Sequence, residues 1–307
     1  MPEILGRILA VVTLGCVLSA CYSGSSDSLR EPVALEGFSA TVQADLPAGA
    51  QVINVAASFY KDGRKQPLVG GDIIEAESDR DAVILRSLEN LSGNYRSQLQ
   101  TDDPAAGVTF TIVHDPEAAR ADRWYPVDEL LVDPGPGELV GLSTGVSFPD
   151  PLVLDAPIGN ELYTDRSQDI VLTWATSPTT EQIRLSTVQT CYSGDRSVQW
   201  GTSAILGATD TGTHTLNLGA LIPATNFINS VTNFIDQLSL IIVSSIIEAY
   251  SFGLIRPQQI EIETFQLDHC TVSLTIFREI SNDLGAGISG GYAIGSTSDT
   301  VTVRFQP

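Results

Sequence analysis

The stretch Thr300-Val301-Thr302-Val303-Arg304-Phe305 alternates strictly between polar and apolar side chains. Successive side chains of a β-strand point to opposite faces of a sheet, so this alternation predicts a strand with one buried and one solvated face. The same pattern occurs at Phe38–Val42 and at Ile170–Trp174. We therefore expect an all-β protein, because antiparallel sheets that bury one face have sequences of this kind.

Turn residues recur about every ten residues between the expected strands, which is the spacing of a sandwich or barrel. Two stretches rich in Pro and Gly interrupt the pattern, Asp133–Gly137 and Pro149–Pro151. We expect two tandem β-sandwich domains, residues 37–149 and 150–307. The expected strands cover residues 38–42, 52–60, a strand opening at 70–72, 82–88, 95–99, 108–113, 170–174, 183–191, 198–205, 213–218, 260–280 and 300–305.

Residues 219–259 break the β pattern as an insertion in the second domain. Apolar side chains recur there at helical spacing, at Phe227, Val231, Phe234 and Leu238. The spacing predicts an amphipathic helix over about residues 226–238, with its apolar stripe buried on the second sandwich or against another subunit, a partner protein or lipid. Its polar face carries no Lys or Arg, which favours a protein partner over lipid. Asp236 and Glu248 interrupt the apolar run that a membrane-spanning helix needs.

Composition limits the classes of partner. The 307 residues include 16 Lys and Arg against 37 Asp and Glu, so the formal net charge is −21. This balance argues against nucleic acid, whose phosphates require Lys and Arg on the protein, and against docking to anionic lipid by charge alone. Three His and one Met leave little material for histidine–metal chemistry, and we expect no metal and no cofactor.

Residues 1–20 have the pattern of a signal peptide. Arg7 precedes an apolar run, Ile8–Leu18, that is too short to span a bilayer. The run ends in Leu18-Ser19-Ala20-Cys21, which resembles the lipobox of bacterial lipoproteins. The resemblance implies that the signal is removed and that Cys21 is acylated, which attaches the protein to a membrane through lipid. The alternative is an ordinary secretory signal followed by a chance cysteine.

The segment after the acylated cysteine indicates a location. Residues 21–36 are rich in Ser and Gly at their start and read as a flexible tether. Tyr22 occupies the position at which an Asp marks retention in the inner membrane of enteric bacteria. Because this residue is not Asp, we expect attachment to the outer membrane of a bacterial cell envelope.

Two cysteines remain in the mature chain, Cys191 and Cys270, because Cys16 leaves with the signal and Cys21 is acylated. In an oxidising compartment one disulfide between them is the economical interpretation. It would close a loop of roughly 80 residues and stabilise the fold by roughly 4.5 kcal/mol, less any strain. Two buried free thiols and metal ligation are the alternatives. Metal ligation is disfavoured because His269 and Cys270 are neighbours in a strand-like run and face opposite sides.

The mature chain resembles exported bacterial lipoproteins with two tandem immunoglobulin-like β-sandwiches. The cues are Gly70-Gly71-Asp72, Tyr95, Ile170–Trp174, the two cysteines and the Gly285–Gly295 stretch before the last strand. Cys191, Trp200 and Cys270 also follow the Cys, Trp, Cys order of antibody domains, with looser spacing. The resemblance implies a sandwich fold and no activity.

Several catalytic and metal motifs match weakly and are better explained structurally. The glycines of residues 285–291 fit both G-x-G-x-x-G and G-x-S-x-G, but no helix with an acidic residue and no His follows them. They are better explained as a hinge that turns the chain into its last strand. His114-Asp115 precedes Pro116 at an expected strand end, and the acidic residues from Asp72 to Asp81 lack a calcium-loop pattern.

These observations favour a membrane-anchored lipoprotein that acts as a non-enzymatic binding or structural module of the cell envelope. Its expected partners are the membrane, through Cys21, and a protein or a second copy, through the 219–259 insertion. The alternative is a hydrolase or carbohydrate-active accessory lipoprotein with a site on its loops. A cleft with convergent titratable groups of shifted pKa would favour that alternative.

Overall fold

The computed structural model describes residues 36–69, 71–87, 93–121, 135–178, 180–224, 228–230, 265–288 and 290–307. The expected signal peptide, Cys21 and all but the last residue of the expected tether lie outside these residues. So do Phe227, Val231, Phe234 and Leu238 of the expected helical stripe. These assignments stay predictions.

The structure confirms the all-β expectation, and most of its strands belong to one ten-stranded sheet. Its main path runs in the order β14 (Arg196–Gly207), β13 (Gln182–Ser193), β16 (His269–Asn282), β17 (Gly291–Phe305), β1 (Phe38–Pro47), β2 (Val52–Lys61), β7 (Asn94–Gln100) and β6 (Arg86–Ser87). Two short strands join at the sides, β11 (Leu162–Tyr163) along β17 and β3 (Arg64–Lys65) along β2. The pairings of β17 with β1 and with β11 are parallel, and the other pairings of this sheet are antiparallel.

Two smaller antiparallel sheets cover the large one. The first contains β5 (Ala82–Ile84), β4 (Asp72–Glu77), β8 (Val108–His114) and β9 (Ser143–Val146). The second contains β10 (Leu154–Ala156), β12 (Asp169–Trp174) and β15 (Thr213–Asn217). Short helices occur at η1 (Pro104–Ala106), α2 (Pro116–Ala121) and α3 (Leu218–Leu221).

The first core fills the space between the large sheet and the β4-containing sheet. Alternate residues of β1 are buried there, from Phe38 to Leu46, while the residues between them face outward. Phe59 stacks on Phe38 with ring centroids 5.5 Å apart and meets Tyr95 edge to face. The Tyr95 hydroxyl accepts a hydrogen bond of 2.7 Å from the backbone N–H of Leu68, so the polar end of this buried ring is satisfied.

The second core lies between the other end of the large sheet and the β12-containing sheet. Ile170, Leu172 and Trp174 alternate inward from β12, as the sequence pattern predicts. They meet Val272, Leu274 and Ile276 of β16, with Val301 and Val303 of β17. Each core is thus a β-sandwich in which two sheets contribute one buried face apiece.

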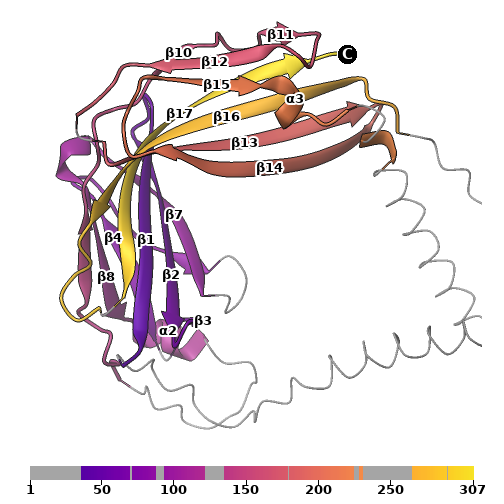
Figure 1. The fold of residues 1–307 in the computed structure, drawn as a ribbon. Coiled ribbons are helices and arrows are strands. Elements are labelled where there is room, and N and C mark those ends of the chain that lie inside the picture. Colours follow the sequence, from indigo (N-terminus) through magenta and orange to yellow (C-terminus); the bar gives the residue numbers. More distant parts are fainter. Residues whose placement is uncertain are drawn as a thin grey trace, which may run out of the picture.

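Two long strands connect the sandwiches. Figure 1 shows β16 and β17 passing through a corner between them, so the large sheet is continuous around the bend. The first part of β17 pairs with β1, and its Ala293 belongs to the first core, whereas Val301 and Val303 belong to the second. The chain after residue 290 therefore contributes to both sandwiches, and the division into domains at residue 150 stays a prediction.

Glycines allow this strand to run close to its neighbours. A side chain at Gly295 would collide with the carbonyl oxygen of Ser147, and one at Gly291 with that of Ala40. Gly291 also has a φ of 106°, which side chains rarely adopt. Glycines were expected to turn the chain into its last strand. Gly291 does so at the start of β17, and Gly295 lets the strand pack close to Ser147.

Residues 228–230 are helical, and Ile228 is buried in the second core. Within the described residues, no helix has the length and apolar character needed to cross a membrane.

Candidate functional site

The large sheet holds a cleft at its bend. The cleft lies on the face of the sheet that is turned away from both cores, which we call the outer face. The cleft has a volume of about 740 Å³ and is lined by strands of both sandwiches. We call it the elbow cleft. It comes from β1, β2, β7 and β17 on one side and from β13 and β16 on the other.

Strand register builds the cleft floor from one line of polar residues. Across six adjacent strands, the paired residues form what we call the polar row, which consists of Gln182, Glu279, Ser296, Asp45, Asn54 and Gln98. All of them except Gln182 line the cleft. Residues directly opposite one another in paired strands face the same side, so all six project to the outer face. Five steps of roughly 4.8 Å give the row a length of about 24 Å along the bent sheet.

Asp45 lies at the centre of the polar row. Its two carboxylate oxygens accept hydrogen bonds of 2.8 Å from the hydroxyls of Ser296 and Ser298 on the neighbouring strand. Burial raises the pKa of Asp45; the two serine hydrogen bonds and the charge of Arg184 work against this rise, and the nearby charge of Glu279 adds to it. Asp45 is therefore easier to protonate than an exposed aspartate.

Glu279 is buried in the polar row, with Ser296 between it and Asp45, and its side chain has two partners of its own. One oxygen accepts a 2.8 Å hydrogen bond from the amide of Gln182, and the other pairs with Arg184 Nε at 2.7 Å. The Arg184 guanidinium also lies over the ring of Phe277, 3.8 Å from its centroid. Arg184 is thus held in place by a carboxylate and an aromatic ring, with 29% of its side chain exposed.

The residue before Glu279 points the other way and anchors the strand. Arg278 donates to Asp210 Oδ2 at 2.9 Å and to the backbone carbonyls of Asp150, Pro151 and Ala175. Both charged side chains of this ion pair are 2% exposed. Burial raises the pKa of Asp210, but hydrogen bonds from Trp174, Ser177 and Gly212 and the charge of Arg278 more than offset it, so the pKa lies below its usual value. Arg278 ties β16 to the chain that enters the second sandwich.

The elbow cleft offers hydrogen-bond donors and acceptors, and charged groups of both signs. Carboxylates, amides, hydroxyls and the guanidiniums of Arg96 and Arg184 line it. Among the described residues its lining includes no His, Cys, Lys or Tyr, and the Ser296 hydroxyl donates to the carboxylate of Asp45. Nor do the described residues contain a group of three or more His, Cys, Asp or Glu that could hold a metal ion. The expectation of no metal and no cofactor stays a prediction.

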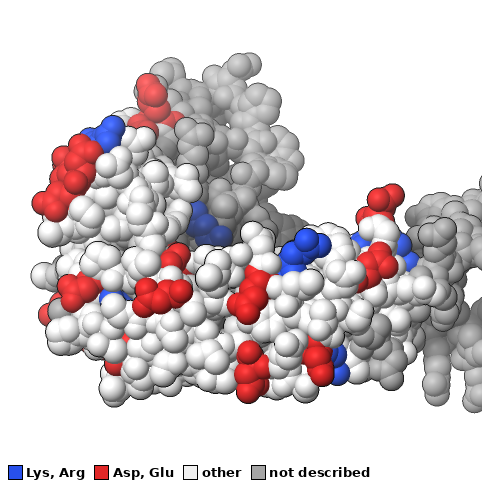
Figure 2. Space-filling view, turned by 90° about the horizontal axis from the view of Figure 1, so that it is seen from above, with Lys and Arg blue, Asp and Glu red and all other residues white. Residues whose placement is uncertain are grey.

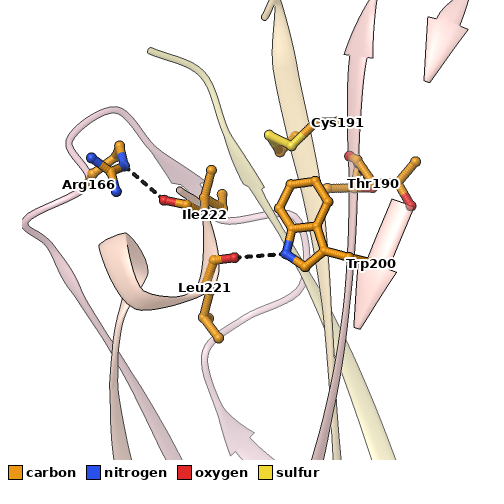
Figure 3. Close-up of a disulfide and its surroundings, with 8 residues drawn as sticks. Arg166, Thr190, Cys191, Trp200, Leu221 and Ile222 are labelled. Carbon is orange, nitrogen blue, oxygen red and sulfur yellow. Dashed lines mark hydrogen bonds between the residues drawn. A yellow bond between two sulfur atoms is a disulfide. The ribbon is translucent and has the colours of Figure 1, made fainter. Parts of the chain in front are cut away.

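The disulfide between Cys191 and Cys270 is present, as expected from the sequence. The two cysteines are paired residues of adjacent antiparallel strands, β13 and β16, and both are fully buried. Figure 3 shows the Trp200 indole near the bridge, with its N–H donating to the carbonyl of Leu221 at 3.2 Å. Arg166 donates to the next carbonyl, that of Ile222, at 2.8 Å. A disulfide and two hydrogen bonds to backbone carbonyls thus hold this end of the second core together.

The position of the disulfide differs from that in antibody domains. There the bridge joins the two sheets of the sandwich across the core. Here both cysteines and Trp200 belong to the same large sheet, on β13, β16 and β14. The Cys, Trp, Cys order seen in the sequence therefore corresponds to a different arrangement in space.

The motifs that the sequence marked as weak have structural roles. His114 lies 3.3 Å from Asp72 across paired strands, and Asp115 instead accepts from the backbone N–H of Glu117 at the start of α2. The acidic stretch does not converge: Asp72 is buried, whereas Asp79 accepts hydrogen bonds from Thr101 and from the backbone of Asp102 and Asp103.

Sequence reasoning missed every residue of the elbow cleft. Asp45 and Ser296 lie beyond the ends of the strands expected at residues 38–42 and 300–305, and their hydrogen bond joins residues 251 apart in the chain. The one available signal was the alternation of residues 38–42, which would place Asp45 on the outward face if the strand were continued to residue 47. The partners could not be read, because neither hydrophobic pattern nor turn chemistry fixes a parallel pairing between the first and last strands.

Acidic residues are distributed over the surface. Figure 2, seen from above, shows Asp and Glu at many separate places on the molecule and few Lys and Arg. This agrees with the sequence, in which residues 21–149 carry 20 acidic against 9 basic residues and residues 150–307 carry 16 against 6. The elbow cleft differs from this surface, since its two carboxylates are matched by two arginines.

Comparisons with known proteins add no assignment of function. No family model and no curated protein matches the sequence. Among solved structures, the chicken CNTN1 FN1-FN3 domains align over 84% of this chain and 66% of that chain, with 8% identity and a TM-score of 0.15. A marsupial T cell receptor aligns over 85% and 74%, with 6% identity and a TM-score of 0.20.

A DUF4785 family protein from Legionella pneumophila aligns over 56% of this chain and 43% of that chain, with 11% identity and a TM-score of 0.18. These TM-scores are too low to support an argument from any one neighbour. What the structure itself establishes is a mostly β protein with sandwich packing and a buried disulfide.

Proposed function

We propose that this protein is a lipid-anchored module of the bacterial cell envelope that binds a ligand in the elbow cleft without changing it chemically. The Leu18–Cys21 lipobox supports the anchor and the tether of residues 21–36 supports a body held away from the membrane surface. The identity of Tyr22 supports the outer membrane as the site of attachment. A second copy or a protein partner at the 219–259 insertion is a further part of this proposal.

One observation carries the binding role: an open cleft of about 740 Å³ whose floor is the polar row. Concave sites with a few convergent polar groups are the usual places for ligands. The carboxylates of Asp45 and Glu279 are each held by two side chains of the protein itself, which fixes their positions before any ligand arrives.

A blocking substitution tests this role. Ala56 is half-buried in the cleft lining beside the polar row, and Ala56→Trp would fill the space above the floor. Full-length protein in detergent would be immobilised, exposed to an envelope extract and washed, and the retained small molecules and glycans would be identified by mass spectrometry. We expect the wild-type protein to enrich a component that Ala56→Trp does not retain.

The matched control is Ser186→Trp on β13. Ser186 lies on the same outward face but outside the cleft lining, so this variant should retain the component. Equal retention by the wild type and Ala56→Trp would contradict the proposal, as would elution of the component in cleaved form.

A hydrolase is the second candidate, and one observation favours it. Asp45 has a raised pKa and lies near a second carboxylate, Glu279, which is the kind of pair that can divide acid and base roles. Against it, both carboxylates are already engaged by protein donors. The test is whether the wild type releases products from envelope glycans. If it does, and if folded Asp45→Asn and Glu279→Gln variants both release none, hydrolysis replaces binding as the proposed function.

A further inference from the structure

We infer that the elbow cleft binds a neutral, hydroxyl-rich chain, of the oligosaccharide class, lying across the strands along the polar row. This inference rests on the proposed binding function and names its ligand class.

Charge selects against strongly charged ligands. Asp45 and Glu279 both lie in the polar row with Ser296 between them, and the cleft lining also includes Arg184 of β13 and Arg96 of β7. A phosphate or other polyanion that approached the arginines would meet two carboxylates, and a polycation would meet two guanidiniums. A neutral ligand encounters neither repulsion.

Hydrogen-bonding capacity selects for hydroxyl groups. The Ser296 hydroxyl donates to Asp45, so its oxygen can still accept a hydrogen bond, and each carboxylate oxygen of Asp45 and Glu279 retains a second lone pair. The guanidiniums of Arg184 and Arg96 supply donors in the same space. A hydroxyl both donates and accepts, so a chain with many hydroxyls can satisfy this mixed set along its length.

Shape selects for an extended ligand. The polar row runs about 24 Å across six strands, and its far end is formed by two exposed amides, Asn54 and Gln98, that hydrogen-bond to each other at 3.1 Å. A peptide adding to this sheet would pair with the backbone of an edge strand. The polar row instead lies on the face of the sheet, where backbone groups are already paired and side chains make the contacts.

The test uses full-length protein in detergent and soluble, neutral linear glucan, mannan and xylan oligomers, with polygalacturonate as the anionic probe. We expect at least one neutral oligomer to bind, with affinity rising with chain length up to the span of the polar row. The double variant Asn54→Ala/Gln98→Ala removes two exposed amides and should weaken binding roughly thirtyfold, because the ligand loses a hydrogen bond to each of them.

Gln199→Ala is the matched control, since Gln199 is an exposed amide on the same face of β14 outside the cleft. It should leave the affinity unchanged. Stronger binding of polygalacturonate than of any neutral oligomer, or equal weakening by Gln199→Ala, would overturn the ligand class. If no oligomer binds while Ala56→Trp still abolishes retention of an envelope component, this inference fails and the binding function stands. If neither occurs, both fail.

Discussion

Replacement of Arg278 by alanine is the sharpest test of how the corner is held together. The substitution removes a guanidinium that is 2% exposed and that donates to Asp210 and to the backbone carbonyls of Asp150, Pro151 and Ala175. It would leave the Asp210 charge buried with Trp174, Ser177, Thr180 and Gly212 as its remaining donors. Three backbone acceptors would also lose a donor.

The expected loss follows from these contacts. Removing one partner of a buried ion pair typically costs about 3–5 kcal/mol, because the other charge stays desolvated. The remaining donors to Asp210 compensate in part, so we expect about 3 kcal/mol at neutral pH. Urea unfolding followed by tryptophan fluorescence is a suitable assay, since the Trp174 indole N–H lies 2.7 Å from Asp210.

Two comparisons make the result interpretable. Arg304→Ala removes an exposed arginine from β17 and should change the free energy of unfolding by less than about 0.5 kcal/mol. The double variant Arg278→Ala/Asp210→Asn should recover part of the loss, because the isolated charge is then absent. A loss below about 1 kcal/mol for Arg278→Ala would refute the reasoning that this ion pair fastens β16 at the corner.

Three further predictions concern other parts of the chain. The double variant Cys191→Ala/Cys270→Ala should lose about 2–5 kcal/mol of stability, and two thiols titrating in the denatured, unreduced wild type would remove the disulfide altogether. The pKa of Asp45 is raised in the folded protein, so this residue contributes stability below its unfolded pKa, and that contribution is lost as pH rises through the folded pKa. The stability of the wild type relative to Asp45→Asn should therefore fall as pH rises from ~3 to ~6. A difference that stays constant over this range would contradict the raised pKa. Cys21→Ser should give an unprocessed precursor without lipid, and incorporation of labelled fatty acid by that variant would exclude the anchor.

The strands that alternate most clearly were predictable. Ile170–Trp174 was expected and forms β12, Asp169–Trp174, because its inward residues are large and apolar. The disulfide was also predictable, since the expected signal peptide and the expected acylation of Cys21 left two cysteines for one bridge. The sequence is sufficient where the burial of one face determines a strand, and where only two cysteines are left to form a disulfide.

The long strand β17 shows where local reasoning fails. The sequence predicts a strand over 300–305, whereas the structure extends it back to Gly291. Residues 291–299 contain two glycines and several small polar side chains, which have weak strand preference. Their conformation is fixed by parallel pairing with β1, a contact between the two ends of the chain. The polar row depends on that same long-range pairing, so the elbow cleft was invisible from sequence.

The central claim is that the elbow cleft is where this protein binds its ligand, and amide hydrogen exchange tests it most directly. Exchange would be measured by mass spectrometry on the full-length protein in detergent, with and without a saturating amount of the component retained from envelope extract. The account predicts slower exchange in peptides spanning Gln43–Ala56 and Ile294–Ser296, with no change in β10, β12 and β15. Protection confined to those three strands, or absent from the cleft peptides, would contradict it.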